Sequence, residues 1–316
     1  MERNLPSRKL YSRRELGGLV LDASKALGLS AVLSYGAALE ANEALDMFPT
    51  SSEFRFADDQ RRLLEAQHLT PGPKSVSLVF GGLNVKNAEL LTHSITPELQ
   101  KFGPVGALNE GANDPNPASI VNEMKKLQDE YGIDEFTFWG NSIGTHIIGE
   151  VVDLADRTNA LNPYRINRVF ADCTPPGPGY GRNPEQEIWL NNQQFQHEPL
   201  LPLLSSLAIH GTPVHPNTGG ANLFWEQAET AQDQRFMFAL NKRMEQDGAK
   251  LVYFGPEDLT ADPIVDTERS ILRMQQIFGD KMSVRWITGP NQNHATAEDF
   301  PEPYLQGIRE EYELAS

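Results

Sequence analysis

The chain has 316 residues, of which 39% are hydrophobic and 9% aromatic, so it can bury a sizeable core and is not a disordered polymer. Its 27 basic and 43 acidic residues give a net charge of −16, which argues against a nucleic-acid partner because such proteins need a basic face. The single cysteine, Cys173, excludes an intramolecular disulfide and a cysteine-based zinc cluster. This composition predicts a soluble globular protein.

A basic segment precedes a moderately apolar stretch near the N-terminus. Arg13 and Arg14, followed by residues 16–39, resemble a twin-arginine export signal. Charged residues interrupt the apolar stretch, and its leucines recur at helical spacing, which favours an amphipathic helix. We therefore expect residues 1–70 to form a helical N-terminal extension of a cytoplasmic protein, with export as the alternative. We expect no membrane span, because no later segment approaches about 20 uninterrupted apolar residues.

From about residue 74, short β-rich runs alternate with helical patterns, which is typical of a parallel sheet covered by helices on both faces. Apolar strands are predicted at residues 75–80, 105–108, 136–139, 168–172, 250–254 and 283–287. Asn116 and Pro117 carry the signal of a helix start, with an N-cap followed by proline at the first helical position. The fold class is therefore α/β, with a mostly parallel central sheet.

The alternation stops over residues 173–249, which contain proline- and glycine-rich loops and aromatic helical pieces. It resumes with the predicted strand at residues 250–254. We therefore predict a core formed by residues 71–172 and 250–316, with residues 173–249 inserted into one sheet as a lid.

The segment Gly140-Asn141-Ser142-Ile143-Gly144 matches the pattern G-x-S-x-G between a predicted strand and a predicted helix. A serine on such a sharp turn is strained, and side chains two residues to either side would collide with the turn. The turn lifts the serine hydroxyl above the sheet edge and directs the helix N-terminus towards it. We predict that Ser142 is a nucleophile; the alternative is an ordinary glycine-flanked turn with a capping serine.

A nucleophilic serine needs a base, and seven histidines are available. Only His294 follows the last predicted strand, in a loop that can carry the imidazole back over the strand ends to the serine. His146 lies four residues after Ser142 on the same predicted helix, where a histidine usually packs or faces solvent. We therefore predict His294 as the general base.

The base in turn needs a carboxylate to hold its tautomer. The loop after residues 250–254 contains Asp258 and Asp262, and the residues themselves leave both open as the acid. Asp266 is better explained as the N-cap of the following helix.

An acyl transfer also needs hydrogen-bond donors for the oxyanion. Gly81 and Gly82 follow an early strand, and their exposed backbone can approach the serine closely. The amides of Leu83 and Ile143 are the expected pair, and a plain tight turn is the alternative.

Together these residues resemble the α/β-hydrolase family, whose order is serine, then aspartate, then histidine. The resemblance covers roughly residues 74–312 and puts residues 173–249 at the position of the family's variable lid. Asp262 and the apolar residues after it resemble the family's acid turn, while the spacing from Gly255 to Asp258 resembles its Gly-x-x-Asp; we favour Asp262. The usual pair of strands before Gly81 is not evident in the sequence.

The resemblance implies a serine hydrolase that cleaves an ester, thioester or related acyl bond through an acyl-enzyme. An acyltransferase would carry the same triad, and a catalytically silent hydrolase fold used for binding is an alternative from another class. The aromatic content of residues 173–249 favours a small-molecule or lipid-like acyl substrate. We expect no cofactor and no metal site, because the sequence has neither an H-E-x-x-H motif nor a tight cluster of histidines and aspartates.

Overall fold

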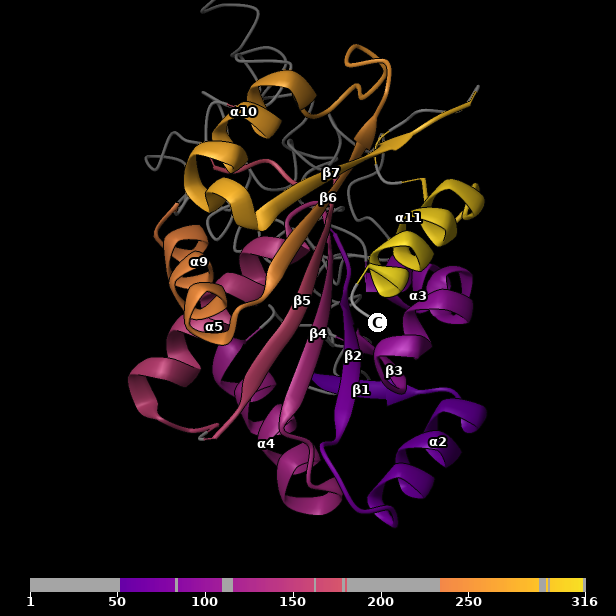
Figure 1. The fold of residues 1–316 in the computed structure, drawn as a ribbon, viewed down its shortest axis with the longest axis vertical. Helices are drawn as coiled ribbons and strands as arrows, with labels where there is room; N and C mark the ends of the chain where they lie inside the picture. The colour runs from indigo at the N-terminus through magenta and orange to yellow at the C-terminus, as the bar shows by residue number, and fades with distance from the viewer. Residues whose placement is uncertain are drawn as a thin grey trace, which may run out of the picture. The chain divides into compact units, whose positions relative to one another are not determined.

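A mostly parallel β-sheet forms the centre of the part of the chain that the computed structural model describes (Figure 1). The described residues are 52–82, 85–109, 116–161, 163–177, 180, 234–289, 294 and 296–314, without the side chains of 85–87. All of them belong to one compact unit.

Seven strands of these residues pair in the order β1-β3-β2-β4-β5-β6-β7. Only β1 is antiparallel to its neighbour, β3. The strands are β1 (Glu53–Phe56), β2 (Ser75–Phe80), β3 (Val105–Asn109), β4 (Glu135–Asn141), β5 (Arg165–Asp172), β6 (Lys250–Pro256) and β7 (Met282–Ile287). The six strands expected from the sequence are confirmed as β2 to β7, and most residues of β2, β4 and β5 are buried, as parallel strands between helices require.

β1 corrects the expectation that residues 1–70 are a helical extension. Its residues form the edge strand of the sheet, and α2 (Asp58–His68), the helix among residues 52–70, comes after it. Phe56 covers Gly106 of β3, where any added Cβ would lie only 2.6 Å from the phenylalanine ring. The strand is hard to recognise in the sequence because it has four residues and two of them are charged. Residues 1–51, on which the export alternative depends, lie outside the described residues.

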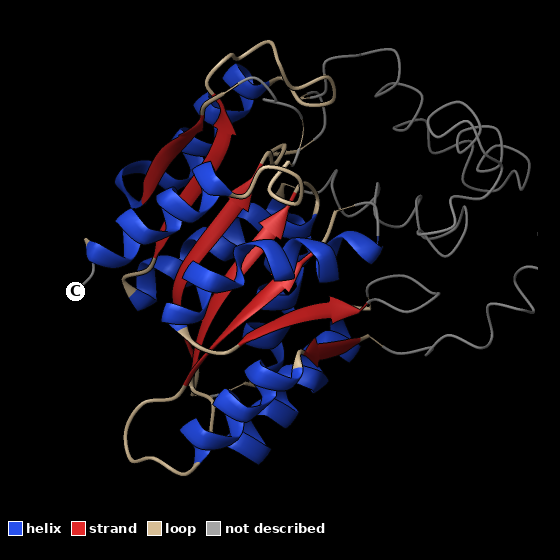
Figure 2. Ribbon diagram, turned by 90° about the vertical axis from the view of Figure 1, so that its right-hand side faces the viewer, coloured by secondary structure: helices blue, strands red, loops and turns tan. Residues whose placement is uncertain are grey.

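Helices cover both faces of the sheet (Figure 2). Besides α2, they are α3 (Val85–Leu99), α4 (Pro117–Tyr131), α5 (Gly144–Thr158), α9 (Arg235–Asp247), α10 (Thr267–Phe278) and α11 (Glu302–Glu313), with short 3₁₀ turns at η1 (Gln100–Phe102) and η3 (Gly279–Lys281). Apolar residues of α4, α5, α9 and α10 form one buried cluster with the sheet, and those of α3 and α11 form a second. In Figure 1, α3 and α11 accordingly lie on one side of the sheet and α4, α5 and α9 on the other.

Helix α9 corrects the predicted C-terminal bound of the lid. Met237, Leu240 and Met244 are fully buried in the same cluster as α5, so α9 is part of the core and the predicted lid does not include it. Residues 181–233 of the predicted lid lie outside the described residues. Among the helices that the structure describes, none is long and apolar enough to cross a membrane.

Two predicted helix starts are confirmed. The Asn116 side chain accepts hydrogen bonds from the amides of Ala118 and Ser119 at the start of α4, and the Asp266 carboxylate accepts one from the Arg269 amide at the start of α10.

The strand register brings the carboxyl ends of five parallel strands to one edge of the sheet. Phe80 of β2 pairs with Gly140 of β4, the end of β4 pairs with Asp172 of β5, and Asp172 pairs with Phe254 of β6. The end of β6 pairs in turn with the end of β7. The loops that carry the predicted site residues all leave the sheet at this edge.

A buried carboxylate fastens α11 to the sheet. Glu311 is 2% exposed, and its two oxygens accept hydrogen bonds from Arg168 of β5 at 2.9 Å and from Arg285 of β7 at 2.6 Å. This network therefore holds the C-terminal part of α11 against β5 and β7.

We expect Glu311→Ala to lower the free energy of unfolding by about 3–5 kcal/mol, because it leaves the buried Arg168 without its partner. Glu310 is a matched control, since its side chain is 42% exposed and pairs with Arg285 at 3.1 Å. Glu310→Ala should lose less than about 1 kcal/mol. Urea denaturation of both variants measures the difference, and equal losses would contradict this view of the network.

Candidate active site

Ser142 lies on a strained turn between β4 and α5. Its φ angle is 53°, in the left-handed region that side chains other than glycine rarely adopt. Its amide donates a hydrogen bond to the carbonyl oxygen of Asp172 at 2.7 Å, which ties the turn to the end of the neighbouring strand. The residue lies at the sheet edge and is 8% exposed.

The flanking glycines are required by close approach of the backbone. A Cβ at Gly140 would lie 2.4–2.6 Å from atoms of Thr145, and one at Gly144 would lie 2.6 Å from the carbonyl oxygens of Phe80 and Gly81. Both separations are shorter than any tolerable contact. The pattern seen in the sequence is therefore a packing requirement of this turn.

His294 forms a hydrogen bond with Asp262, which lies 32 residues earlier in the sequence. Its Nδ1 lies 2.9 Å from Oδ2 of Asp262. The aspartate is fully buried, whereas the histidine side chain is 12% exposed. A ring whose Nδ1–H is held by a carboxylate presents Nε2 as an acceptor on its other side.

Several hydrogen bonds keep the Asp262 carboxylate ionised. Its Oδ1 accepts the amides of Ile264 at 2.8 Å and Val265 at 2.9 Å. Burial by itself would raise the pKa of Asp262, but the hydrogen bond and charge of His294 together with the two amides hold that pKa below its usual value. The group is therefore suited to stabilise an imidazolium.

Asp258, the other candidate acid, occupies a different environment. It is exposed, and its Oδ1 accepts hydrogen bonds from the amide and the hydroxyl of Thr260, at 2.9 and 2.7 Å. The structure thus brings Asp262 to His294 and leaves Asp258 bonded within its own turn.

The structure describes one of the two predicted oxyanion donors. Ile143 follows Ser142 directly and caps α5, and Leu83 lies outside the described residues. Gly82 lies against the turn around Ser142, since a Cβ on it would be 3.3 Å from Cβ of Ser142 and 3.2 Å from Oδ1 of Asn141. The glycine loop is therefore close enough to Ser142 for the predicted role, which stays a prediction.

His146 packs inside the protein, which decides between the two positions, packed or facing solvent, that the sequence left open. It is fully buried, and its Nε2 lies 2.5 Å from the carbonyl oxygen of Pro175. It therefore fastens α5 to the segment after β5.

Sequence reasoning missed Asp172, the last residue of β5. Its carboxyl group is fully buried and accepts a hydrogen bond from the Tyr304 hydroxyl at 3.2 Å. Burial raises the pKa of this carboxyl to about 7, although His294 and hydrogen bonds from Cys173 and Tyr304 act to lower it. Its position at the carboxyl end of a parallel strand was the only signal available in the sequence.

Cys173 follows Asp172 and is also strained, with a φ angle of 47°. Its Sγ, a carboxylate oxygen of Asp262 and a ring nitrogen of His294 lie within 4.8 Å of one another, the only such group among the described residues that could hold a metal ion. In this group Nδ1 of His294 and Oδ2 of Asp262 already share a hydrogen bond.

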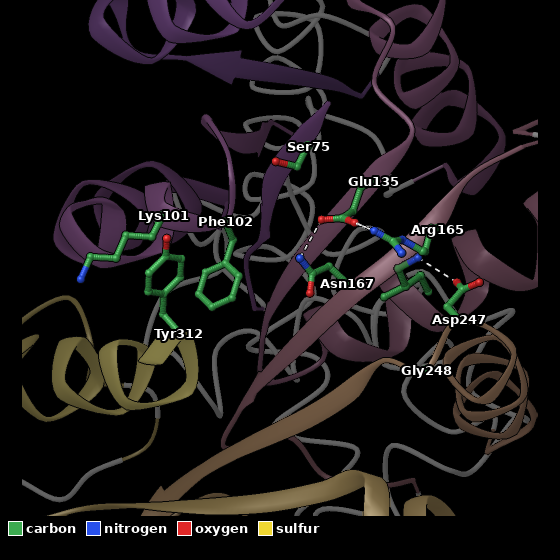
Figure 3. Close-up of a pocket in the computed structure, with 10 residues that line it drawn as sticks. Ser75, Lys101, Phe102, Glu135, Arg165, Asn167, Asp247, Gly248 and Tyr312 are labelled. Atoms are coloured by element: carbon green, nitrogen blue, oxygen red, sulfur yellow. Dashed lines mark hydrogen bonds and ion pairs between the residues drawn. The ribbon is translucent and has the colours of Figure 1, made fainter. Parts of the chain in front are cut away.

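A pocket of about 470 Å³ opens at the opposite end of the sheet (Figure 3). It lies at the amino ends of the strands, where Glu135 accepts hydrogen bonds from Arg165 and Asn167, and Asp247 accepts one from the amide of Ile166. These polar groups satisfy one another, and the pocket is remote from Ser142.

Comparisons with solved structures find similar folds at low sequence identity. An esterase from Exiguobacterium antarcticum is 10% identical with a TM-score of 0.48, covering 77% of this chain and 93% of that one. A carboxylesterase from Bacillus subtilis is 13% identical with a TM-score of 0.44, covering 87% and 96%. A meta-cleavage product hydrolase from Pseudomonas fluorescens is 15% identical with a TM-score of 0.47, covering 78% and 93%. No family model and no curated protein matches the sequence.

Because the pKa of Asp172 is raised, we expect the stability of the fold to depend on pH in a defined direction. A carboxyl that binds its proton more tightly when folded adds stability below its unfolded pKa of 3.8, and that stability is lost as the pH rises through about 7. Asp172→Asn removes this loss, so the melting temperature of the variant minus that of the unaltered protein should rise as the pH increases from 3.8 to about 7 and stay constant above that. Thermal melts across that range measure the difference, and a constant offset would contradict the assignment.

Proposed function

The chain has the α/β-hydrolase fold, as its strand order and antiparallel first strand show, and on this premise we propose that it is a serine hydrolase that cleaves an ester or related acyl bond. The observation that carries the proposal is the pairing of His294 with a buried carboxylate at the same sheet edge as the strained Ser142. Serine, aspartate and histidine follow one another along the chain in the order that this fold uses.

In the first half-reaction, Nε2 of His294 takes the proton of the Ser142 hydroxyl as the serine oxygen bonds to the carbonyl carbon of the substrate. The tetrahedral intermediate then collapses with cleavage of the bond to the leaving alcohol. The alcohol leaves with the proton from the imidazolium, and the acyl group remains on Ser142. Water repeats the sequence with His294 as base, which releases the acid and restores the serine.

Asp262 acts on the histidine, not on the substrate. Its bond to Nδ1 fixes the tautomer in which Nε2 can accept a proton, and its charge stabilises the imidazolium that forms. Because two amides hold the other oxygen, the carboxylate cannot turn away during the cycle.

The negative charge of the intermediate falls next to the start of α5. The Ile143 amide and the positive end of the helix are placed to stabilise it, and Leu83 is the proposed second donor. Gly82 favours this arrangement because a side chain there would crowd Ser142.

The proposed substrate is a small-molecule or lipid-like acyl compound. Removing the nucleophile tests this class of reaction. We expect Ser142→Ala to lower kcat on a cleavable ester by at least ~10³-fold, because the members of a triad act as a unit. The assay uses p-nitrophenyl esters of increasing chain length, with circular dichroism to check that the fold is retained. Unchanged turnover by the variant would refute the mechanism.

The two acidic candidates can be separated on the same ester. Asp262→Asn should lower kcat by roughly 10³- to 10⁴-fold, because the amide favours the wrong histidine tautomer. Asp258→Asn is the matched control in the same loop and should keep its kcat within about two-fold while losing on the order of 1 kcal/mol of stability. The reverse result would assign the acid to Asp258.

A further inference from the structure

We propose that Asp172 and Tyr304 are positioning residues. They hold the loop that carries His294 (between β7 and α11, the histidine loop) in place relative to the turn around Ser142 (residues 140–144, the nucleophile turn). This inference rests on the proposed function, because it concerns how the base is placed relative to the serine. It goes beyond the triad because neither residue is needed as nucleophile, base or acid.

The first part of the connection is the main chain of Asp172. Its carbonyl oxygen accepts the Ser142 amide at 2.7 Å, so the strained turn is fixed to the end of β5. Asp172 also pairs with Asn141 and Phe254 in the sheet, which leaves its backbone little freedom to move.

The second part is the side chain of the same residue. Its Oδ1 accepts the Tyr304 hydroxyl at 3.2 Å, and the oxygen of that hydroxyl accepts the Thr296 amide at 3.3 Å. Thr296 lies two residues after His294. A path of three hydrogen bonds therefore runs from the backbone of the nucleophile to the backbone of the histidine loop.

The surroundings make this path rigid. Asp172 and Tyr304 are fully buried, and the Tyr304 ring packs against both Trp139 and Phe254, with centroids 6.0 and 5.2 Å away. Burial and the neighbouring carboxyl raise the pKa of Tyr304 well above its usual value, so its hydroxyl remains protonated and can donate. Trp139 lies on β4 just before the nucleophile turn, so the ring contact reinforces the same alignment.

The chain contains a matched control for this pair. Tyr164 precedes the amino end of β5, at the opposite end of the strand, and its hydroxyl donates to Oδ1 of Asp156 at 2.8 Å. It is 7% exposed. Tyr164→Phe therefore removes the same kind of tyrosine–aspartate hydrogen bond at a distance from the histidine loop.

We expect Tyr304→Phe to lower kcat on an ester by roughly 10- to 100-fold, because small misplacements of a catalytic group carry losses of this size. The KM should change less than about two-fold, since the hydroxyl does not touch substrate. Tyr164→Phe should leave both constants unchanged. Asp172→Asn keeps an oxygen acceptor and should retain at least about ten-fold more kcat than Asp172→Leu, which has a similar branched shape but no acceptor.

Hydrogen exchange at the Thr296 amide tests the connection without any assay of activity. This amide should exchange faster in Tyr304→Phe than in Tyr164→Phe, measured by mass spectrometry of the peptide that contains it. Equal exchange in the two variants would overturn the proposal, even for a protein that hydrolyses no ester. Faster exchange with unchanged kcat in an active enzyme would also overturn it, because the loop would then be loosened without consequence.

Discussion

The site depends on one strained residue held in place by its neighbours. Ser142 keeps a left-handed backbone conformation because its amide is bonded to the end of β5 and because glycines on both sides allow the backbone of α5 and β2 to approach closely. The parallel sheet provides these neighbours, since its register sets the ends of β2, β4 and β5 side by side. The strain is therefore supported by the fold as a whole, and it is what presents the hydroxyl at the sheet edge.

The remaining chemistry reaches this edge from distant parts of the sequence. Asp262 lies in the loop after β6, and His294 lies in the loop after β7. Their hydrogen bond joins two loops that local interactions alone would not bring together. The two buried aspartates at this edge differ in pKa. His294 and two amides hold the pKa of Asp262 below its usual value, whereas burial raises the pKa of Asp172 to about 7. The pKa values of two buried carboxyl groups at one sheet edge are thus shifted in opposite directions, because His294 and two amides offset the burial of Asp262, whereas burial is the larger effect at Asp172.

Much of this arrangement could be predicted from the sequence, and the parts that could not share a physical cause. The apolar runs of β2 and β4 and the glycines around Ser142 are local signals, so the strands and the turn followed from them. Asp258 and Asp262 lie in the same loop, and only the distance to His294 separates them. Similarly, β1 is short and half charged, and nothing near Asp172 in the sequence shows that Tyr304 will cover it. Long-range contacts decide these features, and a single sequence does not display them.

The proposed reaction requires Ser142 to be an activated nucleophile. Intact-protein and peptide mass spectrometry after treatment with a fluorophosphonate tests it most directly, since the reagent bonds to serines activated in this way. We predict one adduct per chain, located on Ser142, absent from Ser142→Ala and formed far more slowly in His294→Ala. An unmodified chain, or an adduct that persists when Ser142 is replaced, would show that Ser142 is not the activated nucleophile.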